Sequence, residues 1–105
     1  MNYKIFFTPN SQNDLYDIFR YIAFDLQSFE NTAGQLDRLE SAVKSLEQLP
    51  LRFRVYEKEP WKSRNLHIMP VDNYIVLYIA DDNKHTVTIV RIMYGGRNVD
   101  SQLKK

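Results

Sequence analysis

The chain has 105 residues, of which 44% are hydrophobic and 26% are charged, and it contains no cysteine. This length and composition predict one ordinary globular domain over residues 1–105, and they exclude disulfides, a cysteine nucleophile and a thiolate metal site. The net charge of +1 is uneven, because residues 1–48 carry four Lys or Arg against seven Asp or Glu, whereas residues 49–105 carry ten against six. This asymmetry fits either chance or a basic face for nucleic acid or an acidic partner.

The N-terminal segment begins with a short run of β-formers. Residues 3–7 alternate in the manner of a strand, and Thr8-Pro9-Asn10 predicts a turn at its end. The segment lacks the basic region and long apolar run of a secretion signal, and no stretch reaches the roughly 18 apolar residues of a membrane span. We therefore expect a cytoplasmic protein with no membrane partner.

Two stripes of apolar residues at helical spacing follow. The first covers residues 15–26 and predicts a helix of about four turns, with Ser11 as its N-cap and Asp14 near its positive end. The second covers residues 29–46 and ends before Pro50, where proline stops a helix. Because only a short segment separates the two stripes, the helices are expected to form a hairpin.

The C-terminal half predicts strands. Residues 51–63 lack helical spacing and predict an ordered loop, after which β-prone runs end at the turn segments 70–73 and 81–85. In the last run, residues 86–93, the apolar phase slips, which indicates either a bulge or a strand covered on both faces. The order of elements predicts an α+β domain in which an N-terminal strand and a two-helix hairpin precede a three-stranded antiparallel meander, with the hairpin on one face of the sheet.

Four motifs occur along this order of elements: DLYDIFRYIA in the first helix, EPWKSRNL before the second strand, VDNYIVLY in the third strand and RIMYGGRN after the fourth. Together they resemble the RelE/ParE superfamily of bacterial toxins from type II toxin–antitoxin modules. The resemblance covers nearly the whole chain and implies a RelE/ParE-like fold and a small cytoplasmic toxin, held inactive by a cognate antitoxin protein. It also implies two alternative targets, since RelE-like and YoeB-like members cut mRNA on the ribosome and ParE-like members poison DNA gyrase.

Members that cut mRNA need neither a metal nor a cofactor, because the ribose 2′-hydroxyl attacks the phosphate and the protein supplies a base, an acid and cations. The resemblance implies that Glu59, in EPWK, is the general base. Arg64 and Arg97 are candidates for a phosphate clamp, because a guanidinium group matches phosphate bidentately. The adjacent glycines at 95–96 favour a close approach of the backbone to a ligand before Arg97.

Other candidate residues have a chemical and a structural interpretation. His67 is a candidate for proton exchange near neutral pH, and Tyr94 for stacking on a base or donating a proton, although both also fit structural roles in a strand. Glu59 equally fits a solvent-exposed loop carboxylate. Trp61 is expected to pin its loop to the core, and Arg91 to pair with an acid in a half-buried position.

The chain departs from the RelE-like pattern at three places. Ile75 follows the third-strand tyrosine, where those members carry an arginine. Asn65 and His67 align with a pair of lysines that the RelE-like members carry in the second strand. Those members also carry a tyrosine a few residues beyond the arginine that Arg97 matches, whereas residues 100–103 of this chain contain none. Three interpretations stay open: a metal-independent, ribosome-dependent endoribonuclease, which we take first; a non-enzymatic gyrase inhibitor; and a decayed toxin that only binds its antitoxin.

Overall fold

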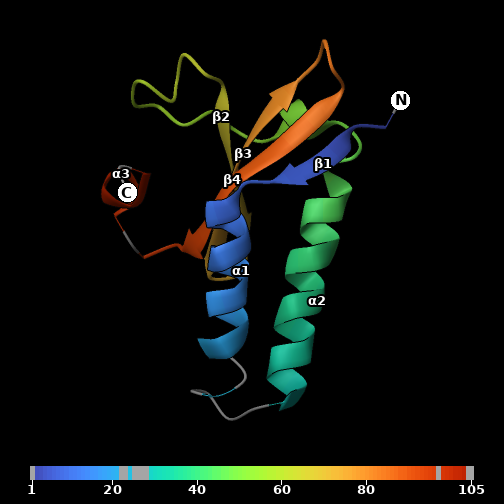
Figure 1. Cartoon of the computed structure of the whole chain (residues 1–105), viewed down its shortest axis with the longest axis vertical. Coiled ribbons are helices and arrows are strands. Elements are labelled where there is room, and N and C mark those ends of the chain that lie inside the picture. The colour runs from blue at the N-terminus through green and yellow to red at the C-terminus, as the bar shows by residue number, and fades with distance from the viewer. Residues whose placement is uncertain (1, 22–23, 25–28, 97, 104–105) are drawn as a thin grey trace.

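The computed structural model describes residues 2–21, 24, 29–96 and 98–103, with the backbone alone considered for residues 29–33. Its elements, in chain order, are β1 (Lys4–Phe7), α1 (Pro9–Arg20), α2 (Phe29–Ser45), the 3₁₀ turn η2 (Pro50–Arg52), β2 (Leu66–Val71), β3 (Tyr74–Asp81), β4 (Thr86–Tyr94) and α3 (Val99–Leu103). Figure 1 shows α1 and α2 running antiparallel beside each other, with α3 apart from both. None of the helices in these ranges is long and apolar enough to cross a membrane.

The four strands form one sheet in the order β1-β4-β3-β2. Strands β2, β3 and β4 make the predicted antiparallel meander, and β1 pairs with β4 in parallel. The strand at the N-terminus and the strand near the C-terminus are therefore neighbours. A single sheet with separate helices confirms the predicted α+β class. The sequence did not indicate the parallel pairing.

A β-bulge explains the phase slip in the last strand. Leu77 pairs with Arg91, but the next residue of β3, Tyr78, pairs with Ile89, so Val90 is an extra residue in β4. Because of this extra residue, the inward and outward alternation of side chains after the bulge is shifted by one position relative to the alternation before it. Ile89 and Ile92 consequently both face the same core, although they are three residues apart.

The start of α1 differs from the prediction. Thr8, not Ser11, is the N-cap, because the Thr8 hydroxyl oxygen accepts the Ser11 backbone N–H at 3.0 Å. The Thr8-Pro9-Asn10 segment is therefore the helix entry and not a separate turn. Proline suits this first position, since its fixed φ matches the helix and its missing N–H would have no partner there. The predicted end of this helix lies largely outside the described residues.

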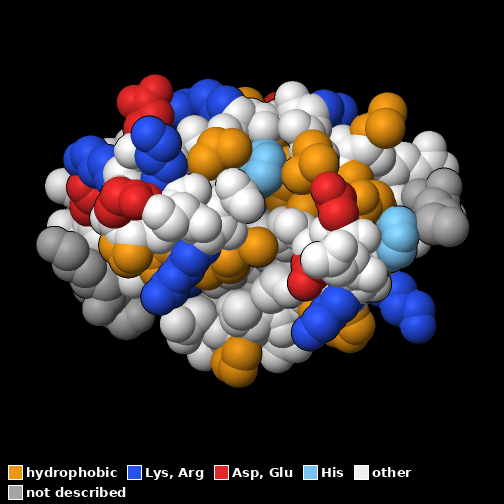
Figure 2. All heavy atoms as spheres, turned by 90° about the horizontal axis from the view of Figure 1, so that it is seen from above, with side chains coloured by type: hydrophobic (Ala, Val, Ile, Leu, Met, Phe, Trp, Pro, Cys, Tyr) orange, Lys and Arg blue, Asp and Glu red, His pale blue; other side chains and the backbone are white. Residues whose placement is uncertain are grey.

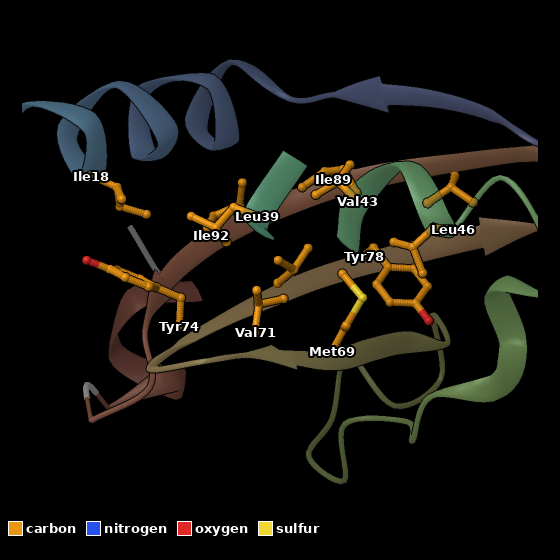
Figure 3. Packing of buried hydrophobic residues seen from close by; sticks show 12 residues of the cluster. Ile18, Leu39, Val43, Leu46, Met69, Val71, Tyr74, Tyr78, Ile89 and Ile92 are labelled. Atoms are coloured by element: carbon orange, nitrogen blue, oxygen red, sulfur yellow. The ribbon is translucent and has the colours of Figure 1, made fainter. Parts of the chain in front are cut away.

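The main core lies between the helices and one face of the sheet (Figure 3). Ile18 of α1 and the α2 residues Leu39 and Val43 point toward the sheet with Leu46, which follows α2. The sheet contributes the facing residues Met69, Val71, Tyr74, Val76, Tyr78, Val87, Ile89 and Ile92. Leu39 and Leu46 are fully buried, so truncating either one to alanine would cost roughly 2–5 kcal/mol.

The opposite face of the sheet is also covered. Its buried residues, Leu66, Ile68, Leu77 and Met93, pack with Tyr56 under the loop that precedes β2 and under α3. The meander strands are therefore buried on both faces, which explains why Leu66 to Met69 are buried without interruption. Helix α3 was not predicted from the sequence, because five residues are too few to show a helical period.

Candidate functional site

Glu59 lies in the loop before β2, and both of its carboxylate oxygens are occupied. One oxygen accepts the backbone N–H of Ser63 at 2.7 Å, and the other accepts the Ser63 hydroxyl. The Ser63 hydroxyl, followed by its N–H group, lowers the pKa of Glu59 below its ordinary value. A carboxylate that is held ionised by two donors closes the local turn well, but it is a weaker base than a free carboxylate.

Arg64 is exposed at the end of the same loop. Its guanidinium lies over the Trp61 ring, 5.1 Å from the ring centre, which is a cation–π contact. Trp61 is half-buried and packs against the buried residues on the opposite face of the sheet, which we call the second core, as the sequence predicted. The loop thus presents Glu59, Lys62 and Arg64 to solvent around one anchored aromatic ring.

His67 lies on the other face of the sheet, within the main core. It is 4% exposed, and its ring stacks on Tyr78 with the ring centres 5.2 Å apart. Its Nδ1 atom lies 2.8 Å from the backbone oxygen of Asn65. These contacts match the structural interpretation of this histidine, because it is closed off from solvent and from the Trp61 loop.

Tyr94 ends β4 with its ring half exposed and its edge against Tyr74. Gly96 packs on this ring, where an added Cβ would come 3.0 Å from the aromatic carbon Cε1. The Gly95 N–H donates to the oxygen of Asn73 at 2.8 Å, and a Cβ there would lie 3.3 Å from that oxygen. Gly95 thus permits close approach to the protein's own β2–β3 turn, and Gly96 permits close packing on the Tyr94 ring. Arg97, the other phosphate-clamp candidate, lies outside the described residues.

The described candidate residues do not gather at one point. Glu59 and Arg64 share the loop over the second core, whereas His67 stacks on a tyrosine of the main core. Tyr94 contacts Tyr74, which also belongs to the main core. Figure 2 shows Lys and Arg side chains mixed with Asp and Glu over the end of the molecule that is uppermost in Figure 1. This view shows no single basic patch of the kind that the charge asymmetry allowed.

Arg91 forms a clasp between three elements, which confirms its expected pairing with an acid. Its Nε and Nη2 atoms donate to the Asp14 carboxylate of α1 at 2.6 and 2.9 Å, and Nη1 donates to the Gln102 oxygen of α3 at 2.7 Å. Asp14 also accepts the Ile92 N–H at 3.0 Å, where β4 extends beyond the end of β1. Asp14 therefore serves as a partner for the strand edge as well as for Arg91.

Two hollows lie between α1 and α2, and the sequence analysis indicated neither. The first, which we call the apolar groove, has a volume of about 660 Å³ and is lined by Ile5, Phe7, Leu15, Phe19, Leu36, Leu39 and Val43, among others. The second, which we call the tyrosine pocket, has a volume of about 680 Å³ and is lined by Tyr21, Tyr74 and Tyr94 together with charged side chains. Ile92 lines both, so the two hollows are neighbours that share one wall residue.

Comparison with known proteins gives one family and several similar folds. The family model described as "ParE toxin of type II toxin-antitoxin system, parDE" matches residues 5–99. A search of curated protein sequences finds no match. A toxin–antitoxin complex from Mycobacterium tuberculosis, RelBE2, contains a chain that is 23% identical with a TM-score of 0.64, over 90% of this chain and 99% of that one.

Two further structures have the same fold. A chain of the chromosomal ParDE system from P. aeruginosa is 16% identical with a TM-score of 0.65, over 88% of this chain and 95% of that one. A chain of the archaeal RelE–RelB complex from Pyrococcus horikoshii OT3 is 17% identical with a TM-score of 0.63, over 93% of this chain and 100% of that one. These likenesses extend across both the ParE-named and the RelE-named proteins.

Proposed function

This chain belongs to the family of ParE toxins of type II toxin–antitoxin systems, and from that membership we propose that it arrests growth by binding DNA gyrase and not by cutting RNA. Its partner, which holds it inactive, is an antitoxin. The proposal carries over to this chain the target that the superfamily resemblance implies for ParE-like members. We take the cytoplasm as the place of action, since both alternative targets are found there.

One observation supports the choice between the two targets: among the residues that the structure describes, the candidates for RNA cleavage do not converge on one point. General acid–base cleavage needs a base, an acid and phosphate-binding cations around a single bond. Glu59 is engaged by Ser63, and His67 is buried on the opposite face of the sheet. A toxin that works by binding alone has no need for these groups to converge.

The apolar groove is the site that we assign to the antitoxin. Phe19 and Tyr16 at its margin are exposed, and the groove lining is mainly apolar side chains from β1, α1 and α2. An exposed apolar groove between two helices suits an amphipathic helix of a partner, which buries its apolar face there. Glu40, Lys44 and Glu47 at the rim can contact the polar face of that helix.

A ribosome-dependent endoribonuclease is the second candidate function. It is favoured by the loop over the second core, where Glu59, Lys62 and Arg64 are all exposed. On that interpretation Glu59 takes the proton from the 2′-hydroxyl, and Arg64 binds the phosphate together with Arg97.

The substitution Glu59→Gln separates the two candidates. Glutamine keeps an oxygen that accepts the Ser63 N–H but is not basic, so a general base at this position would lose about 10²–10⁴-fold in activity. Toxicity is measured at matched protein levels in a bacterial host, with primer extension on a reporter mRNA. Supercoiling by purified gyrase is measured alongside. Glu57→Gln, at another exposed carboxylate of the same segment, is the matched control.

We expect both variants to arrest growth as the wild type does, to inhibit supercoiling and to leave the reporter mRNA uncut. Loss of toxicity in Glu59→Gln alone, together with mRNA cuts by the wild type, would reject the gyrase proposal and support the ribonuclease. Unimpaired growth with the wild type would indicate a decayed toxin.

A further inference from the structure

The tyrosine pocket contains four charged side chains, and three of them are already neutralised. Arg91 is paired with Asp14 at 2.6 Å, and Arg38 is paired at 2.5 Å with Asp72 beside the pocket. Asp17, on α1, has no ion pair or hydrogen bond to another described side chain, and it is exposed. The pocket therefore has one uncompensated charge, and that charge is negative.

Aromatic rings flank this carboxylate. Tyr21, one turn of helix after Asp17, and Tyr94, at the end of β4, are each about half exposed, at 50% and 51%. Tyr74 is buried beneath them, and burial, followed by the proximity of Tyr21 and Tyr94, raises its pKa. Tyr74 consequently stays neutral at physiological pH, and the half-exposed rings and hydroxyl oxygens of Tyr21 and Tyr94 are accessible to a guest.

A carboxylate beside open tyrosine faces is the chemistry that binds a guanidinium or an ammonium group. The ring faces attract the cation, the carboxylate neutralises it, and the hydroxyl oxygens accept its N–H bonds. An anionic guest fits less well, because Arg38 and Arg91 are each already neutralised by a carboxylate and Asp17 would repel it. A purely apolar guest would leave Asp17 without a partner in the interface.

We propose that the tyrosine pocket receives one arginine or lysine side chain of the antitoxin, against Asp17, Tyr21 and Tyr94. This inference rests on the proposed binding of the antitoxin in the apolar groove. Both hollows are lined by α1 and α2 and share Ile92 as a wall residue, so a segment seated in the groove is next to the pocket and can extend a side chain toward it. The groove provides apolar contact area, and the pocket fixes the position of the bound segment along the gap between the helices.

A double-mutant cycle on the toxin–antitoxin complex tests this. The antitoxin encoded beside this gene is titrated by calorimetry into wild-type toxin, Asp17→Asn and Tyr94→Leu. Each Lys and Arg of the antitoxin is then changed singly to Gln. Asp37→Asn is the matched control, because Asp37 is an exposed acid of α2 that does not line the pocket. Circular dichroism verifies that every toxin variant is folded.

We expect Asp17→Asn and Tyr94→Leu each to weaken binding by roughly 10-fold, and Asp37→Asn to change it by less than about 2-fold. One antitoxin Lys→Gln or Arg→Gln change should weaken binding by a similar factor in wild-type toxin and have almost no further effect in Asp17→Asn. If the antitoxin binds and none of its cations couples to Asp17, this inference is wrong while the proposed function stands. If wild-type toxin does not bind the antitoxin, the proposed partner and this inference are both wrong.

Discussion

Removal of Asp14 should destabilise the protein far more than removal of a surface acid. Its carboxylate accepts three hydrogen bonds, two from Arg91 and one from the Ile92 N–H, and both charged side chains are only 13% exposed. Asp14→Ala leaves a largely buried guanidinium and a strand N–H without their acceptor. Breaking a buried pair by removing one partner costs about 3–5 kcal/mol.

We take the lower end of that range, because Arg91 keeps its bond to the Gln102 oxygen and retains some contact with water. A loss of about 3 kcal/mol in the free energy of unfolding corresponds to a fall of about 12–24 °C in Tm for a domain of this size. The Arg38–Asp72 pair is the contrast, since its side chains are 57% and 40% exposed. Arg38→Ala should therefore cost far less stability than Asp14→Ala.

Urea unfolding followed by circular dichroism and by tryptophan fluorescence measures both variants, and coincident transitions verify that the unfolding is two-state. The double variant Asp14→Ala/Arg91→Ala should lose less stability than the sum of its single changes, because it leaves no unpaired guanidinium. If Asp14→Ala costs no more than Arg38→Ala, then the clasp between α1, β4 and α3 does not stabilise the fold and the reasoning is refuted.

Two other predictions follow from single residues. Burial raises the pKa of Tyr56 and of Tyr78 to about 12, from a value of 10.0 when unperturbed. The folded protein then retains protons that the unfolded chain releases. The contribution of these tyrosines to the free energy of unfolding is therefore fully present below pH 10 and is lost as the pH rises toward 12. Tyr78→Phe should reduce this loss in urea titrations at several pH values, and an unchanged pH dependence would contradict the prediction. If Arg97 binds phosphate or another oxyanion of the target, Arg97→Lys should reduce growth arrest despite keeping the charge, and Arg97→Glu should abolish it at matched protein levels. A fully toxic Arg97→Glu variant would remove this residue from the site.

The sequence predicted those parts of the fold that have a local signal. Periodicity located both long helices and all four strands, and the phase slip in the last strand marked the bulge at Val90. The N-cap was misassigned because Thr8-Pro9-Asn10 matches a turn as well as a helix entry. The helix α3 was missed because it has only five residues.

The candidate site was less predictable, because it depends on contacts between distant segments. The pairing of Arg91 with an acid was expected, but its partner Asp14 is 77 residues away in sequence. The two hollows arise from the gap between α1 and α2, which no residue pattern on either helix encodes by itself. The burial of His67 likewise depends on another strand, because its ring stacks on Tyr78 of β3.

The position of β4 has a consequence for the synthesis of the protein. This strand is central in the sheet, with β1 on one side and β3 on the other, yet it is the last strand to leave the ribosome. At synthesis rates of about 5–20 residues per second, the N-terminal strand waits several seconds before its neighbour exists. Until then β1 has no strand to pair with, and the main core lacks Val87, Ile89 and Ile92.

A chain that stops before Thr86 therefore lacks the middle of its sheet and the clasp residue Arg91. Such a fragment exposes the apolar faces of α1 and β3, which makes it a substrate for proteases and chaperones. Aborted translation before Thr86 consequently leaves β1 without the strand that joins it to the meander.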